Sequence, residues 1–331
     1  MRLVTYNIEW FAHLFDDADN LMLDDKPSGR YGIDRYTQGQ AIAQVLQRLD
    51  ADAVMVVEAP NTGRKQRCTR ALERFAAEAG LRTDTAVSGF ATDTHQEIAL
   101  LYDPAVMNVE ADPKSSQRAP RFDDSFQIDL DVDDRMDLVR FSKPPLELHA
   151  TTKGGTVLRL IGAHLKSKAP HGAKTAEEVA QVSIANRRKQ LAQAIWLHRR
   201  IKEHVESGDN IIVMGDLNDG PGLDEYERLF GKSSVEIVMG TELRDPHAQN
   251  LLKPREPVLP STSRFYNPET KRYFRALLDY IMISQGLEAH APSWRIWHPF
   301  EDAECYDDIP LREALLAASD HFPVSLDLQL T

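Results

Sequence analysis

Cysteine is scarce in this chain of 331 residues, which contains only Cys68 and Cys305. Two thiols so far apart in the sequence cannot cross-link a small secreted scaffold, so we expect no disulfide bond. They also cannot form a thiolate zinc site, and the sequence has no His-Glu-x-x-His motif. Zinc is therefore a weaker candidate than a cation that prefers oxygen ligands.

Long apolar runs are also missing. No segment approaches the ~20 consecutive apolar residues that a membrane-spanning helix requires, and the chain opens with an alternating, strand-like segment in place of a basic and then apolar leader. These features predict a cytoplasmic protein without a membrane anchor.

Basic residues are outnumbered by acidic ones. The 39 Lys and Arg residues face 51 Asp and Glu residues, which gives a formal net charge of −12. An acidic surface disfavours broad, non-specific binding of nucleic acid. An acidic enzyme that acts on phosphate groups would therefore need a cation at its site.

The chain does have the composition of a globular protein, with 42% hydrophobic and 27% charged residues. Apolar, β-branched runs predict strands, and amphipathic segments between them predict helices. The predicted strands are 3–8, 53–57, 98–102, 156–163, 211–214, 278–283 and 323–328, and the predicted helices are 36–49, 68–79 and 176–205. In the last helix, an apolar stripe from Val179 to Ile201 is expected to face the core.

No repeat and no long Pro/Gly/Ser-rich linker divides the chain. We therefore expect a single α/β domain over residues 1–331 with long surface loops. The predicted loops are 16–36, 110–124 and 246–263.

Polar side chains recur at the ends of the apolar strands. One such residue after a strand is more often a turn former or a helix cap, but here the pattern repeats at strand after strand. Because open sheets bind ligands beyond their strand ends, these side chains could converge at one edge. The residues are Asn7, Glu9, Glu58, His164, Asp216, Asn218, Asp279, Ser319, Asp320 and His321.

These residue types suit the hydrolysis of a phosphoester. Mg²⁺ prefers oxygen ligands and bridges one or two carboxylates to a substrate phosphate, and Glu58 and Asp320 are the first candidates for that role. Hydrolysis also requires a base for the attacking water, an acid for the leaving oxygen and positive charge around the phosphoryl group. Two histidines, one divalent ion and nearby Lys or Asn donors would supply these functions.

The ordered set of motifs resembles the endonuclease/exonuclease/phosphatase superfamily over residues 3–328. The motifs are Thr-Tyr-Asn7-Ile-Glu-Trp, the strand-end Glu58, Gly-Ala-His164-Leu-Lys-Ser, Met-Gly-Asp216-Leu-Asn218-Asp, Leu-Leu-Asp279-Tyr-Ile and Ala-Ser319-Asp320-His321-Phe-Pro-Val. The resemblance implies a four-layer α/β sandwich, in which two mostly antiparallel sheets pack face to face with helices outside. It also implies a Mg²⁺-dependent phosphoesterase site at one edge of the sandwich, with Mn²⁺ as a substitute.

The resemblance implies a role for each matching residue. Glu58 looks like the principal metal ligand, with Asn7 and Asp320 beside the metal or its water shell. Asp216 and Asn218 resemble the pair that orients the attacking water and contacts the scissile phosphate.

His321 looks like the histidine beside the phosphate, held by Asp279 in a pair that fixes its tautomer and favours the imidazolium. Whether Asp216 or His321 accepts the proton of the water stays open at this point.

The His164-Leu165 pair resembles the deoxyribonuclease I-like branch, because apurinic-site nucleases usually place a tyrosine in this region. In that branch a strand-borne glutamate orients the histidine, and Glu97 matches its position. We therefore expect a Glu97–His164 dyad that acts on the leaving group. The alternative is that Glu97 caps a strand beside solvent.

Lysines supply the remaining phosphate-binding candidates. Lys143 stands where the branch tends to have an arginine, and lysine supplies charge without the two-pronged guanidinium geometry. Lys166 follows His164 in a cationic segment that could receive a polyanion or be an ordinary solvated loop. With Asn7 and Asn218, these lysines are the expected phosphate-binding groups.

Three functions are compatible with these motifs. The sequence favours a Mg²⁺-dependent nuclease that cleaves nucleic-acid phosphodiesters, without an obligate protein partner. A phosphatase or phosphodiesterase acting on a small-molecule or lipid phosphate is the alternative, although a lipid substrate is less favoured because no exposed aromatic hairpin is evident. A non-catalytic binding module is the third possibility.

Aromatic and basic residues at 263–274 could bind a single strand, or could belong to a strand pair with a turn at Asn267-Pro268.

Overall fold

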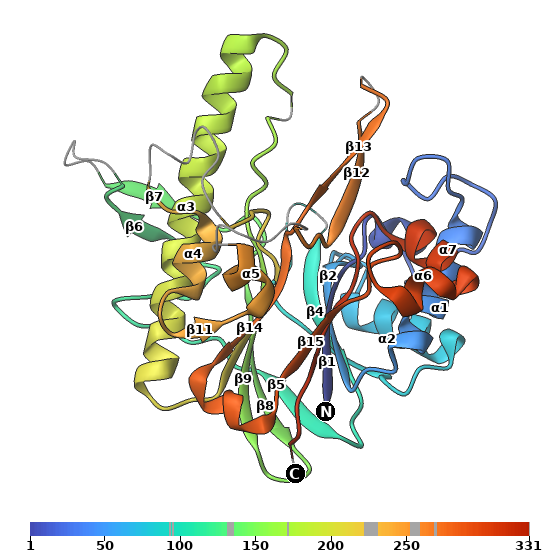
Figure 1. Cartoon of the computed structure of the whole chain (residues 1–331), viewed down its shortest axis with the longest axis horizontal. Coiled ribbons are helices and arrows are strands. Elements are labelled where there is room, and N and C mark those ends of the chain that lie inside the picture. The colour runs from blue at the N-terminus through green and yellow to red at the C-terminus, as the bar shows by residue number, and fades with distance from the viewer. Residues whose placement is uncertain are drawn as a thin grey trace.

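A computed structural model shows two six-stranded β-sheets packed face to face, with helices on both outer faces (Figure 1). It describes residues 1–92, 94, 96–130, 136–170, 172–221, 231–251, 259–267 and 270–330. The arrangement confirms the predicted four-layer α/β sandwich. Among the described residues, no helix combines the length and the apolarity that crossing a lipid bilayer would take.

Each sheet has one parallel pair of neighbouring strands and is otherwise antiparallel. The first sheet runs in the order β15 (Ser293–Ile296), β16 (Val324–Asp327), β1 (Arg2–Asn7), β2 (Ala53–Ala59), β4 (Glu97–Tyr102) and β3 (Thr85–Ser88). The second runs in the order β11 (Leu243–Arg244), β14 (Asp279–Ser284), β10 (Ile211–Asp216), β9 (Val157–His164), β8 (Leu146–Thr152) and β5 (Met107–Ala111). Two separate ribbons pair β6 (Phe126–Ile128) with β7 (Asp137–Val139), and β12 (Ser263–Asn267) with β13 (Arg272–Ala276).

Helices cover the outer faces of the two sheets (Figure 1). The first sheet is covered by α1 (Arg35–Leu49), α2 (Cys68–Ala79), α6 (Ala303–Asp307) and α7 (Ile309–Ala318). On the side of the second sheet lie α3 (Ala176–Glu206), α4 (Ser234–Met239) and α5 (Pro246–Leu251). Two short 3-10 helices, η1 (Phe11–Leu14) and η3 (Gln285–His290), complete the named elements.

Strand alternation divides the buried residues into three layers. Along β2, Met55 belongs to the cluster between the two sheets, whereas Val54 and Val56 belong to the cluster between the first sheet and its helices. A third cluster fills the space between the second sheet and α3 and α4. This alternation explains why the strands are apolar on both faces, as is typical of strands buried on two sides.

The two parallel pairs bring the polar strand ends together. In the first sheet, β1 and β2 run parallel with Asn7 opposite Val57, and in the second, β9 and β10 run parallel with His164 opposite Asp216. The side-chain amide of Asn7 donates a hydrogen bond to Asp216 Oδ2 at 3.0 Å, which links the two sheets. The carboxyl ends of all four strands therefore meet at one edge of the sandwich, as the sequence predicted.

Glycine is required directly before the last residue of β10. Gly215 has a φ of 140°, and a Cβ atom there would lie 2.0 Å from the carbonyl oxygen of Ala163. The backbones of β9 and β10 thus approach closely just before His164 and Asp216. Such an approach is open only to a residue without a side chain.

The predicted strands and helices are confirmed, with ends shifted by one or a few residues. One expectation about the last helix was wrong. The apolar stripe of α3 is buried in its second half, but its N-terminal half extends beyond the sheet, where Val179 and Ile184 are partly exposed (Figure 1). The predicted loop at 246–263 begins with α5, and its residues 252–258 lie outside the described part of the chain.

Candidate active site

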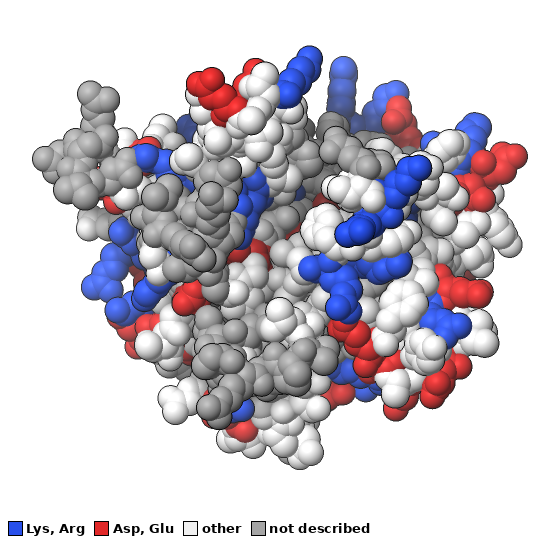
Figure 2. Space-filling model, turned by 45° about the horizontal axis from the view of Figure 1, so that its top comes forward, with Lys and Arg blue, Asp and Glu red and all other residues white. Residues whose placement is uncertain are grey.

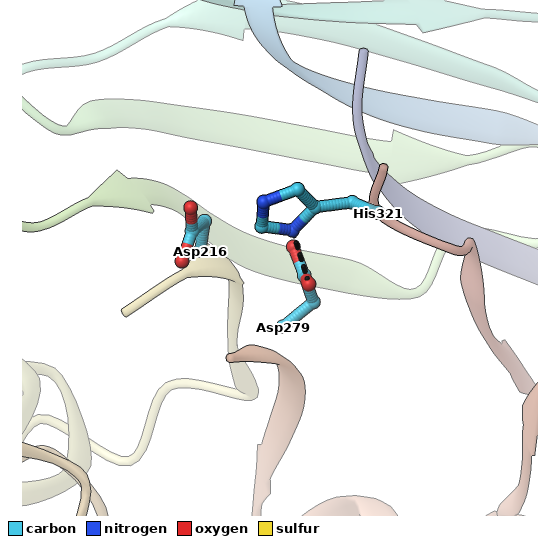
Figure 3. A group of neighbouring side chains, drawn as sticks. All are labelled: Asp216, Asp279 and His321. Atoms are coloured by element: carbon cyan, nitrogen blue, oxygen red, sulfur yellow. Dashed lines mark hydrogen bonds and ion pairs between the residues drawn. The ribbon is translucent and has the colours of Figure 1, made fainter. Parts of the chain in front are cut away.

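A buried Asp-His pair lies at the edge where the strand ends meet. His321 Nδ1 lies 2.8 Å from Asp279 Oδ2, at the start of β14. The Thr262 hydroxyl donates to the same oxygen at 2.7 Å and accepts hydrogen bonds from the backbone N–H groups of Leu278 and Asp279. Thr262 therefore holds Asp279 in position, and Asp279 in turn orients the imidazole of His321. The pair is thus preorganised. Figure 3 shows the far side of the His321 ring facing Asp216.

The pair keeps His321 in its charged form. Burial by itself lowers the pKa of His321, but the negative charge of Asp279 and the hydrogen bond to it hold the pKa well above its usual value. Asp216 adds to this effect. This favours the imidazolium form of His321, which can donate from its second nitrogen.

Amide groups surround the carboxylate of Asp216. It accepts hydrogen bonds from Asn7 Nδ2 at 3.0 Å, from the Asn218 backbone N–H at 2.7 Å and from Asn218 Nδ2 at 3.2 Å. Asn218 adopts a left-handed backbone with a φ of 52°, a conformation that asparagine tolerates better than most residues. Burial and the nearby Asp279 raise the pKa of Asp216 to about 7.

The surroundings of the other histidine of the site favour its neutral form. His164 Nε2 lies 2.8 Å from Lys143 Nζ and 3.6 Å from Asp216 Oδ2. Burial and the charge of Lys143 hold the pKa of His164 well below its usual value. Burial also lowers the pKa of Lys143 to about 8, against the attraction of Glu58 and Asp216. The pKa values of the two histidines are therefore shifted in opposite directions.

A β-bulge directs Glu58 into the site. By strand alternation, the residue after Val57 should face the helices, as Val56 does, but the register of β2 shifts between Val57 and Ala59. Glu58 takes a left-handed backbone there, with a φ of 61°. Its carboxylate senses the charges of Lys143 and His321, so the bulge turns it toward the site. Burial raises the pKa of Glu58.

Oxygen atoms without hydrogen bonds lie beside Glu58. Among the described residues, the buried Asn7 Oδ1 and Asp320 Oδ1 accept no hydrogen bond. The Ser319 hydroxyl donates to the backbone oxygen of Asn7 at 2.8 Å, which joins the last motif to the first strand. Burial and the charge of Asp320 raise the pKa of Glu9 to about 7, so several carboxylates crowd this corner. The donor set is all oxygen and fits a hard divalent cation.

A second group of possible ligands is Asp216, Asp279 and His321, whose ligand atoms lie within 4.8 Å of one another. Asp216 and Asp279 Oδ2 already accept hydrogen bonds and His321 Nδ1 is bound to Asp279, but Asp279 Oδ1 is buried without a hydrogen bond from the described residues. In the Glu58 corner all the possible ligand atoms are oxygens, and Asn7 Oδ1 and Asp320 Oδ1 accept no hydrogen bond from the described part of the chain, so this corner is the better candidate for a hard cation.

Arg30 is a member of the site that the sequence did not indicate. It comes from the loop predicted at 16–36, yet its side chain is 11% exposed and pairs with Glu9, with Asp320 Oδ1 at 4.0 Å. Its guanidinium also donates to the backbone oxygen of Leu316 at 3.1 Å. Contacts between residues so far apart in the sequence leave no local pattern, so no signal could have identified Arg30.

With this geometry established, comparison with known proteins decides the family. The model of the endonuclease/exonuclease/phosphatase family matches residues 4–321. The chain belongs to this family. Members of the endonuclease/exonuclease/phosphatase family are phosphoric ester hydrolases, and this chain is one of them.

Solved structures of the family have the same fold. Truncated TDP2 from Caenorhabditis elegans is 15% identical, with a TM-score of 0.52, over 98% of this chain and 96% of that chain. A family member from Bacteroides thetaiotaomicron is 14% identical, with a TM-score of 0.50, over 98% and 96% of the two chains. A humanised D. rerio TDP2 is 11% identical, with a TM-score of 0.50, over 98% of this chain and 97% of that chain. A search among curated proteins finds no match.

The expected Glu97–His164 dyad of this family member is not formed. The carboxylate of Glu97 accepts from the backbone N–H of Thr62 at 2.8 Å and from the Thr92 hydroxyl at 2.9 Å. Residues of β4 alternate, and Ala99 and Leu101 face the helices of the first sheet. Glu97 shares their face, whereas His164 ends a strand of the other sheet and contacts Lys143 and Asp216. The prediction was wrong, because the residue that faces the site lies one position before Glu97 in the chain.

Gln96, the residue before Glu97, is the one that faces the site. Its side-chain amide lowers the pKa of Glu58, so it lies close to this carboxylate and can help to position it. Sequence reasoning missed Gln96, although the alternation of β4 was a signal that could have identified it.

These neighbouring residues provide a matched pair of variants. We expect Gln96→Ala to lower kcat/KM for a small phosphodiester by roughly tenfold or more, because orienting partners of a ligating carboxylate contribute on that scale. Glu97→Gln should change it less than about threefold, since Glu97 touches neither histidine. Steady-state kinetics with both variants measure this, and a larger effect of Glu97→Gln than of Gln96→Ala would contradict the assignment. Thermal melting separates loss of stability from loss of turnover.

Lys166, the last expected phosphate-binding residue, lies beside the site. Burial and the charge of Lys189 lower the pKa of Lys166, and the charge of Lys166 in turn lowers that of Lys143. Its backbone N–H donates to Gln193 Oε1 at 2.9 Å, which fixes the segment to α3. Lys168, in the same cationic segment, pairs with Asp219.

Proposed function

We propose that the protein hydrolyses phosphodiester bonds of nucleic acids by metal-assisted attack of water. The observation that carries this proposal is the Asp279-bound His321 facing Asp216, with the oxygen-rich Glu58 corner beside them. Acid, base and cation ligands thus surround one position, which is the combination that phosphoester hydrolysis requires.

The chain's own residues would act as follows. Asp216, held by the amides of Asn7 and Asn218, accepts the proton of the attacking water. His321 cannot do so while Asp279 keeps it protonated, and it donates instead to an oxygen of the scissile phosphate. Of the two candidates, Asp216 is therefore the base that we propose.

Lys143 and His164 would act together on the phosphate. The ammonium group of Lys143 contacts the neutral imidazole of His164 and supplies positive charge between Glu58 and Asp216. With Lys166 nearby, it would bind the phosphate oxygens as a point charge, without the bidentate geometry of an arginine. Asn7 and Asn218 would add amide donors.

Mg²⁺ is the cation that we propose, with Mn²⁺ as a substitute. Glu58, Asn7 and Asp320 would hold it, since their oxygens are buried and partly unpaired. When bound, it would neutralise charge on the phosphoryl group and on the leaving oxygen.

A substrate panel tests the proposal. Single-stranded DNA, duplex DNA, RNA, an abasic duplex, bis(4-nitrophenyl) phosphate and a small phosphomonoester are each incubated with Mg²⁺, with Asp216→Ala as the inactive control. We expect cleavage of an oligonucleotide, and a log–log dependence of kcat/KM on salt with a slope of roughly −0.7 for each phosphate contacted on a single strand. Hydrolysis of the monoester alone, with little dependence on salt, would favour the small-molecule phosphatase instead.

A further inference from the structure

The β12–β13 ribbon stands outside both sheets and projects from the edge that holds the site (Figure 1). Its base is part of the site. Ser263 pairs with His321 in an isolated bridge, and the backbone N–H of Arg264 donates to the backbone oxygen of Asp320 at 2.8 Å. The Phe265 ring lies edge-on to His321, with a centroid distance of 5.4 Å. The wall beside His321 thus continues into the ribbon.

Aromatic rings remain exposed along this ribbon. Tyr266, Tyr273 and Phe274 are 42%, 53% and 55% exposed. Tyr31, which follows Arg30 in the N-terminal loop, is 94% exposed, and its ring lies nearly parallel to that of Tyr266, with centroids 6.2 Å apart. Such a cluster of exposed rings marks an interaction surface.

Positive charges are interleaved with these rings. The Arg264 guanidinium lies 3.4 Å from the centroid of the Tyr273 ring, and Lys271, Arg272 and Arg275 are exposed on the same ribbon. Figure 2 turns the top of Figure 1 toward the viewer and shows Lys and Arg side chains gathered where the ribbon comes forward. In a chain with a net charge of −12, this is a local reversal of sign that suits a polyanion.

The sequence between the two strands argues for nucleic acid over a lipid surface. It reads Pro-Glu-Thr-Lys from Pro268 to Lys271, which is polar, whereas a hairpin that enters a bilayer needs an apolar tip. The rings lie along the sides of the ribbon, where flat bases can stack on them with arginines at hand for the phosphates. Tyr266 is three residues from Ser263, a rise of about 10 Å, so such bases would lie within a few nucleotides of the scissile phosphate.

We propose that the β12–β13 ribbon, together with Tyr31, binds single-stranded nucleic acid by stacking its bases next to the site. This inference rests on the proposed function and specifies its substrate class. Tyr266 and Tyr273 provide the stacking faces, and Arg272 contacts the backbone.

The test uses two double variants of the full chain. Tyr266→Leu with Tyr273→Leu removes the stacking faces but keeps apolar volume, whereas Tyr266→Phe with Tyr273→Phe keeps both. A matched control is Tyr306→Leu, because Tyr306 is half exposed and stacked by Arg312 on another surface. Binding of a fluorescent oligothymidylate is measured by anisotropy in a His321→Ala background, and kcat/KM is measured for the oligonucleotide and for bis(4-nitrophenyl) phosphate.

We expect the leucine double variant to bind the oligonucleotide about tenfold or more weakly, and the phenylalanine double variant and Tyr306→Leu to bind within about twofold of the parent. The leucine variant should also lose more kcat/KM for the oligonucleotide than for the small diester. Unchanged oligonucleotide binding in the leucine variant would overturn the inference. So would a loss of binding to phosphatidylglycerol vesicles in the leucine variant without any change in its binding of the oligonucleotide.

The two proposals fail separately. If the parent protein cleaves no diester, the proposed function fails, while the anisotropy measurement still decides whether the ribbon binds a single strand. If the parent cleaves both diesters and the leucine variant keeps full oligonucleotide binding, only the ribbon inference fails.

Discussion

Replacing His321 with alanine is expected to lower kcat/KM for a phosphodiester by about 10²–10⁴-fold, the range that a positioned acid or base contributes. His321 Nδ1 lies 2.8 Å from Asp279 Oδ2, and its ring faces Asp216. Asp279→Asn keeps the shape of the pair but removes the charge that maintains the imidazolium, so it should lose most of the same activity. Steady-state rates on bis(4-nitrophenyl) phosphate measure both effects.

A matched control for this loss is His298→Ala. His298 is as buried as His321 and hydrogen-bonds Ser261 and the backbone N–H groups of Phe300 and Glu301. Its replacement costs packing and hydrogen bonds but removes nothing from the site. Equal losses of activity in the two alanine variants, at matched thermal stability, would show that His321 has only a structural role.

Removal of divalent cations is expected to abolish activity, and added Mg²⁺ to restore it. Glu58→Gln should raise the Mg²⁺ concentration for half-maximal activity by about tenfold or more, because it removes the charge of the proposed principal ligand while keeping the bulged backbone. The thermal stabilisation of the protein by Mg²⁺ gives an independent measurement, since a cation that binds only the folded state raises the melting temperature.

Glu110→Gln is the control for Glu58→Gln. Glu110 is largely exposed, on β5, and its partner is His149. The Glu110→Gln substitution should change neither the Mg²⁺ dependence of activity nor the thermal stabilisation by Mg²⁺. Full activity of the parent protein after exhaustive chelation would contradict the assignment of a cation to the Glu58 corner.

The positions of Asn7, His164 and Asp216 could be predicted because parallel strands bring their carboxyl ends to one edge, so local pattern alone determines where these residues meet. Glu58 reaches the same edge for a different reason. The bulge at Val57/Ala59 turns the Glu58 side chain to the opposite face of the strand. Nothing in the apolar run 53–57 indicates that a residue is inserted there. Glu58 was predicted as a site residue from the family motif alone. Strand alternation would have predicted that its side chain faces the helices.

Glu97 and Arg30 show what the sequence could not determine. Neighbouring residues of a strand point to opposite faces, so an error of one residue exchanges the two faces. The expected dyad required Glu97 to lie on the face that Gln96 occupies. Arg30 joins the site from a loop whose path depends on contacts with Glu9 and with α7, which are remote in sequence. The aromatic and basic residues of the β12–β13 ribbon were visible in the sequence, but their projection beside His321 was not.

The hydrogen bond between Asn7 and Asp216 has a consequence for how the enzyme unfolds. Each sheet carries only part of the catalytic groups, so an opening that separates the two sheets would disable the enzyme even while each sheet kept its own secondary structure. Activity is thus tied to the cooperative docking of the two halves, and amide exchange of the strand ends at this seam should slow when a ligand bridges them.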